Sequence, residues 1–92
     1  MEITFDPAKS ERNIVLRGLN FERAADFGWG KANFDEDTRN DYPERRFVAA
    51  GYLDKRLHIL CFSETERGVR IISFRKANQR EARDHDKTLT ID

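Results

Sequence analysis

The sequence predicts an α+β fold with two N-terminal helices, an antiparallel sheet of three to four strands and one C-terminal helix. Three observations lead to this prediction. Helix-start residues and apolar residues spaced for one helical face mark the first third of the chain. After Pro43, apolar residues follow a period of two in three runs joined by short polar turns. A helix-capping pattern then begins at Asn78.

Two helices are expected before the sheet. The Asp-Pro pair at positions 6–7 opens the first, because aspartate accepts hydrogen bonds at the N-cap and proline suits the first turn. Gly18 ends it, as glycine commonly does just past a helix. Asn20 is expected to cap the second helix, residues 21–29, which has one apolar face. A charged connection follows, with an edge strand expected near residues 32–34.

Three strands are expected after this connection, at residues 44–53, 56–64 and 68–75. The connecting segments "DK" and "TERG" are short and polar, so an antiparallel meander is the natural arrangement. The inner parts of the strands are apolar on both faces, and we therefore expect helices to cover much of the sheet. Asn78 then caps the last helix, with Glu81 three residues later completing a capping box.

The composition predicts one small soluble domain spanning residues 1–92, with residues 87–92 as a flexible tail. Only 38% of the residues are hydrophobic and 37% are charged, so the core must be small. No run approaches the roughly 20 apolar residues of a membrane span. The single cysteine, Cys61, excludes an internal disulfide framework and fits a reducing compartment. We therefore expect a cytoplasmic protein without membrane contacts.

The formal net charge of zero conceals a separation of charge along the chain. Residues 35–44 contain five acids and one arginine, whereas residues 67–83 contain six bases and one acid. Arginine outnumbers lysine by twelve to five, and a guanidinium can bind phosphate or carboxylate through two hydrogen bonds at once. This pattern indicates an anionic partner, although a solvated surface with local salt bridges would have the same composition.

The chain has no P-loop, dinucleotide-binding glycine motif, nucleophile elbow or H-E-x-x-H motif. Its two histidines, His58 and His85, are too isolated to predict a metal site with Cys61, so neither a metal nor a cofactor is expected. We assign His58 a structural role because it lies in the middle of a predicted strand. We expect His85, between two aspartates near the chain end, to be exposed.

Arginines on neighbouring strands of the meander form the main candidate site. Arg46 enters the first strand, Arg70 lies within the third and Arg75 ends it, so the three can converge on one surface. Glu64 leaves the second strand and reaches the same rim, where it suits either proton transfer beside a phosphate or a structural ion pair. Arg70 and Arg75 are an odd number of residues apart. In a regular strand they would therefore point to opposite faces.

Four blocks of the sequence, in this order and spacing, resemble the BrnT family of toxins, the ribonuclease components of bacterial type II toxin–antitoxin systems. The blocks are "FDPAKSERN" at residues 5–13, "GLNFERA" at residues 18–24, "ERRFVAAGYLDKRLHIL" at residues 44–60 and "SETERGVRIISFRKANQRE" at residues 63–81.

The resemblance implies a RelE-like fold and an endoribonuclease that cleaves RNA without a metal and so inhibits translation and growth. It also implies a cognate antitoxin that is BrnA-like and has a ribbon-helix-helix part. The complex would contact DNA only through this antitoxin. The alternative is a non-catalytic module that binds RNA or protein through the same basic face.

The expected site follows from the arginines of the meander and from the resemblance to the BrnT family. The expected catalytic residues are Arg70, Arg75, Glu64 and Arg46, and the expected RNA-binding residues are Lys9, Arg17, Lys76 and Arg80. One segment departs from the family pattern, which commonly has Lys-His-Gly after the first helix where this chain has Leu16-Arg17-Gly18. Arg17 can bind phosphate but is a poor proton acceptor. The departure predicts altered or even lost activity.

Overall fold

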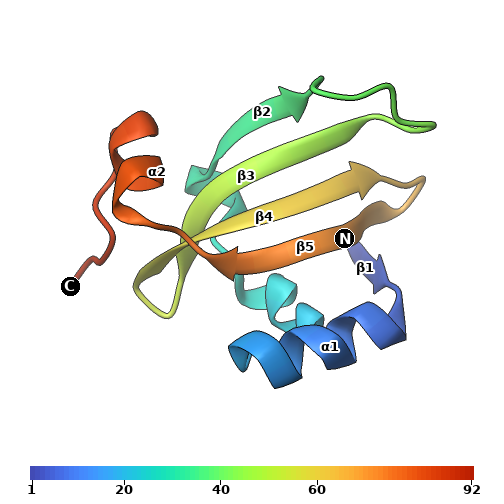
Figure 1. Ribbon diagram of the computed structural model, residues 1–92, viewed down its shortest axis with the longest axis horizontal. Coiled ribbons are helices and arrows are strands. Elements are labelled where there is room, and N and C mark those ends of the chain that lie inside the picture. The colour runs from blue at the N-terminus through green and yellow to red at the C-terminus, as the bar shows by residue number, and fades with distance from the viewer.

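Five strands form one mixed sheet in the order β1-β5-β4-β3-β2 (Figure 1). The computed structural model describes residues 1–92. β1 pairs in parallel with β5, and all other neighbouring strands are antiparallel. The strands are β1 (Glu2–Phe5), β2 (Asn33–Asp37), β3 (Arg46–Leu53), β4 (Arg56–Glu64) and β5 (Gly68–Lys76).

The helical segments are short and lie on both sides of the sheet (Figure 1). They are α1 (Pro7–Arg17), the 3₁₀ helices η1 (Phe21–Asp26) and η2 (Trp29–Lys31), and α2 (Gln79–Asp84). The larger core cluster joins η1 to one face of the sheet, with Phe74 and Leu60 at its centre. A smaller cluster joins Ala82 of α2 to the opposite face. None of these helices is long and apolar enough to span a membrane.

The first helix, α1, has the limits that its end residues predicted. The Asp6 side chain accepts a hydrogen bond from the Ala8 amide, and Gly18 adopts the left-handed conformation with φ 66°. Only Ser10 of this helix is buried, so polar bonds rather than apolar packing attach it to the domain. The Asn13 amide donates to the Phe74 carbonyl at 2.9 Å. This bond holds α1 beside β5.

The predicted RelE-like arrangement, with two N-terminal helices and an antiparallel sheet of three to four strands, is wrong. The second helical segment is a six-residue 3₁₀ turn, because Asn20 begins it but Phe27 and Gly28 already leave the helix. The sheet also gains a parallel edge strand, β1, alongside Gly68–Ile71 of β5. The segment from residue 2 to residue 5 is too short to show strand periodicity by itself.

A β-bulge in β5 changes the faces on which its side chains lie. Cys61 of β4 pairs with Ser73, whereas the next residue, Phe62, pairs with Ile71, so Ile72 is the extra residue. The bulge places Arg70 and Arg75 on the same face of the sheet despite their odd separation. A regular strand would have placed them on opposite faces.

Candidate functional site

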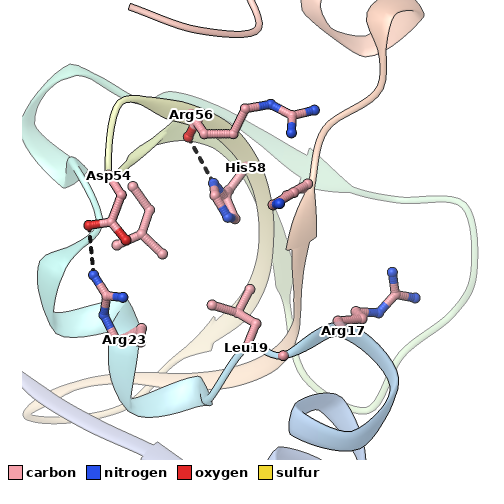
Figure 2. Close-up of a pocket in the computed structure, with 9 residues that line it drawn as sticks. Arg17, Leu19, Arg23, Asp54, Arg56 and His58 are labelled. Carbon is pink, nitrogen blue, oxygen red and sulfur yellow. Dashed lines mark hydrogen bonds and ion pairs between the residues drawn. The ribbon is translucent and has the colours of Figure 1, made fainter.

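A cavity of about 640 Å³ opens where the end of α1 meets the β3–β4 turn and the end of β5 (Figure 2). We call it the His58 cavity, and its volume is in the range usual for small-ligand sites. Figure 2 shows Arg17 and Arg23 on opposite sides of the opening. The charged and titratable side chains that line the cavity are Arg17, Arg23, Asp54, Arg56, His58 and Lys76.

His58 and Lys76 come together because they are paired directly across β4 and β5. Directly paired residues of adjacent strands project to the same face, here the face toward α1. His58 packs beside the Phe74 ring with the ring centres 5.5 Å apart, and its side chain is nearly buried. The two strands thus place an imidazole next to an ammonium group at the cavity wall.

The backbone fixes the tautomer of His58. Its Nδ1 lies 2.8 Å from the Arg56 carbonyl oxygen (Figure 2), and because a carbonyl only accepts, Nδ1 must carry the hydrogen. The only buried side-chain nitrogens or oxygens without a partner are the Nε atoms of Arg46 and Arg56. The one hydrogen bond of the His58 ring is made by Nδ1. Nε2 is not among the buried atoms that lack a partner, so it is accessible from the cavity that His58 lines, with its lone pair free.

The surroundings keep the His58 ring neutral. Burial lowers its pKa below the usual value, and the charges of Arg56 and Lys76 lower it further. The hydrogen bond to the Arg56 carbonyl and the charge of Asp54 oppose this shift but do not reverse it. An unperturbed histidine has a pKa of about 6.5, so His58, with its lowered pKa, is an uncharged proton acceptor at pH 7.

The cavity carries more positive than negative charge. Its one carboxylate, Asp54, accepts a hydrogen bond of 2.8 Å from Nη2 of Arg23, and this bond lowers the pKa of Asp54. Arg56 donates to a backbone carbonyl rather than to an acid, at 2.7 Å from Ala77. Arg17 and Lys76 form no ion pair. Three cations are thus left without an acidic partner around a neutral imidazole, an arrangement suited to an anion.

A second cavity of about 230 Å³ lies between α1 and β5 and extends this cationic surface. Lys9, Arg12 and Arg17 line it from α1, so Arg17 belongs to both cavities. Three residues predicted to bind RNA, Lys9, Arg17 and Lys76, therefore lie along one continuous surface. The fourth, Arg80, is exposed in the first turn of α2 and lines neither cavity.

The predicted convergence of Arg46 and Arg70 occurs elsewhere, on the opposite face of the sheet. Arg46 pairs with Ser63, which in turn pairs with Arg70, so the two arginines flank a serine in one row across three strands. The Arg46 guanidinium lies 4.0 Å from the centre of the Tyr42 ring. Ser63 lies five residues from His58 along β4, a distance of roughly 16 Å at about 3.3 Å per residue.

Glu64 and Arg75 do not join this row. Glu64 pairs with Val69, whose side chain enters the core on the opposite face from Arg70. Arg75 is held by two hydrogen bonds of 2.8 and 2.7 Å to the Glu81 carboxylate, which attach β5 to α2. The Arg75 guanidinium lowers the pKa of Glu81 to about 2. The geometry of Arg75 is that of a structural ion pair.

Residues 5–81 match the family described as the ribonuclease toxin BrnT of type II toxin–antitoxin systems. The chain belongs to the BrnT family. No curated protein matches the chain. BrnT membership implies a ribonuclease whose substrate is RNA and whose partner is an antitoxin protein. α1 ends at Arg17, and Arg17 and Gly18 lie at the opening of the His58 cavity.

The sequence analysis left out several residues that line the His58 cavity. It treated His58 as structural and gave no role to Arg23, Asp54 or Arg56. A regular register of the β4–β5 hairpin would have paired His58 with Arg75. The bulge at Ile72, which has no clear sequence signal, shifts the partner to Lys76. A histidine within the apolar run "LHILCF" was the one available indication.

Proposed function

We propose that this BrnT-family chain cleaves RNA without a metal ion and that the scissile phosphate binds in the His58 cavity. The observation that carries the proposal is a group of cations without an acidic partner around a neutral imidazole. These cations are Arg17, Arg56 and Lys76. Positioned guanidinium and ammonium groups can stabilise the charge that builds on phosphate oxygens, the task that a metal ion performs in other nucleases. Family membership supports RNA as the source of that phosphate.

The nucleophile in the proposed reaction is the 2′-hydroxyl next to the scissile phosphate. Its attack gives a 2′,3′-cyclic phosphate and a free 5′-hydroxyl, and the phosphate oxygens gain negative charge in the transition state. Lys76, paired directly with His58, is positioned to meet this charge. Arg17 lies at the rim with its guanidinium directed away from His58 (Figure 2), and with Lys9 in the adjoining cavity it can hold a neighbouring phosphate. Arg46 and Arg70 are too distant to contact the same phosphate, and we propose that they hold a different part of the RNA backbone.

The test is incubation of the purified protein with an end-labelled single-stranded RNA in excess EDTA. We expect cleavage at the same rate as in magnesium, with cyclic phosphate ends. A 2′-deoxy substitution at the cleaved nucleotide should block that cut, because the nucleophile is removed. Cleavage that requires added metal would contradict the proposed chemistry. Binding without cleavage under every condition would favour the RNA-binding module.

We also propose that the partner is a BrnA-like antitoxin with a ribbon-helix-helix part, which silences the toxin and links the complex to DNA. Support comes from the family and from the exposed cationic surface, which an acidic segment can cover. We expect a small protein encoded by the neighbouring reading frame to co-purify with this chain and to suppress its RNA cleavage and its inhibition of growth. A neighbour that does neither would contradict this assignment.

A further inference from the structure

We propose that Nε2 of His58 is the general base of RNA cleavage and accepts the proton of the attacking 2′-hydroxyl. This inference rests on the proposed ribonuclease function and assigns the proton transfer in the same cavity. It replaces the role that the sequence suggested for Glu64, which projects from the other end of β4. A base must lie within hydrogen-bond reach of the proton that it takes, and His58 is the one neutral titratable side chain in the cavity wall.

Two contacts orient the His58 ring. Its Nδ1–H donates to the Arg56 carbonyl at 2.8 Å, and the ring packs beside the Phe74 ring at an interplanar angle of 58°. A carbonyl that holds one ring nitrogen protonated leaves the other with a free lone pair, the form that a general base requires. The Arg56 carbonyl thus orients this base as a carboxylate does in a catalytic triad. Because Nε2 forms no hydrogen bond within the protein, no protein group competes with a substrate hydroxyl for it.

The charged groups around His58 come from every element that packs against the cavity. Arg17 ends α1, Arg23 lies in η1, Asp54 lies in the β3–β4 turn, Arg56 begins β4 and Lys76 ends β5. Arg23 and Asp54 neutralise each other through their ion pair. The charges of Arg56 and Lys76 disfavour protonation of His58. Together with Arg17 they favour the approach of a phosphate. One arrangement thus keeps the base free and brings the substrate to it.

In the proposed step, His58 takes up one proton and Lys76 gives up one. The 2′-O–H bond breaks, its proton passes to Nε2 and the 2′-oxygen forms a bond to phosphorus. The bond between phosphorus and the 5′-oxygen breaks, and the departing oxygen takes a proton from the Lys76 ammonium group. Lys76 is paired directly with His58, so acid and base lie side by side on one face. His58 then releases its proton to solvent and Lys76 regains one from solvent, which restores the starting state.

His58→Asn removes the base and keeps a side-chain amide that can still donate to the Arg56 carbonyl. We expect kcat/KM for RNA cleavage to fall by roughly 10²- to 10⁴-fold, the usual contribution of a general base. RNA affinity should change little, because the cations remain. The matched control is His85→Asn at the other histidine, which caps the end of α2 and lines neither cavity. We expect this control to cleave RNA as the wild type does.

The pH profile separates a base from a merely structural histidine. Protonated His58 cannot accept a proton, so kcat/KM of the wild type should fall as the pH drops. Because burial lowers the pKa of His58, the midpoint should lie below the usual value of about 6.5, with full activity at pH 7. This acid limb should be missing from the residual activity of His58→Asn. A limb that is identical in the variant and the wild type would overturn the assignment.

The remaining outcomes are also decisive. Wild-type cleavage with an equally active His58→Asn variant would remove His58 from the mechanism and leave the proposed ribonuclease function standing. Absence of wild-type cleavage with or without metal would end both proposals. If His58→Asn does not fold, His58→Gly can be assayed with added imidazole. A cleavage rate that rises with imidazole concentration supports the assignment, and a rate that does not rise contradicts it.

Discussion

Replacing Lys76 with methionine is expected to lower the rate of RNA cleavage by roughly 10- to 1,000-fold, because the site loses a charged donor to the transition state. Lys76 ends β5, forms no ion pair and lies directly opposite His58. Methionine keeps most of the apolar stem, so the variant removes the charge with little change in packing. The loss should appear mainly in kcat, since the charge that Lys76 stabilises develops during the reaction.

The measurement is the single-turnover cleavage rate of labelled RNA, with thermal melting of each variant to establish that the fold survives. Lys31→Met is the matched control, because Lys31 ends η2 and lines neither cavity. Arg70→Ala provides the contrast with the other cationic surface. If Arg70→Ala lowers the rate more than Lys76→Met, the scissile phosphate is held on the opposite face of the sheet, and the His58 cavity is not the catalytic site.

Local signals in the sequence predicted the limits of α1, the positions of two strands and the start of α2. The Asp-Pro pair and Gly18 gave the observed limits of α1, and the period of two located β4 and β5. The capping box at Asn78 is present, with the Glu81 carboxylate accepting from the Asn78 amide and the Asn78 side chain accepting from the Glu81 amide. Each signal acts within a few residues, and such contacts can be inferred without knowledge of the fold.

Features that depend on distant contacts could not be inferred in this way. Parallel pairing of β1 with β5 joins residues more than 60 positions apart and adds an edge that local periodicity does not show. The bulge at Ile72 depends on how β5 packs against β4, and it decides that Arg70 and Arg75 share a face. Even so, Arg75 is paired with Glu81, a partner that the sequence analysis had assigned only to helix capping.

In the candidate site, too, some features follow from local sequence signals and others depend on distant contacts. The meander was enough to bring Arg46 and Arg70 together, because strands joined by tight turns are neighbours. His58 lines a cavity only because of the tertiary arrangement. The end of α1 approaches the β3–β4 turn and leaves a cavity over a position that would otherwise be core. A histidine in an apolar strand has the same local sequence whether it faces packed side chains or an opening.

The largest effect on stability outside the apolar core is expected for Gly68→Ala. Gly68 pairs with Glu2 at the start of the β1–β5 ladder, and an added Cβ would lie 2.0 Å from the Glu2 carbonyl oxygen and 2.6 Å from the Glu2 nitrogen. Both atoms belong to the backbone and cannot rotate away. The variant must therefore displace β1, and we expect a loss of about 1–3 kcal/mol in the free energy of unfolding, the usual cost of overpacking.

Thermal melting and urea unfolding measure this loss, and each kcal/mol should lower the Tm by roughly 4–8 °C for a domain of this size. Gly30→Ala is the matched control, because nothing lies within 4 Å of the methyl group that it adds. Lys76 and His58 lie at the other end of β5 and β4, so RNA cleavage below the melting transition should persist in both variants. Equal stability of Gly68→Ala and Gly30→Ala would mean that the parallel pairing of β1 with β5 contributes little to holding the domain together.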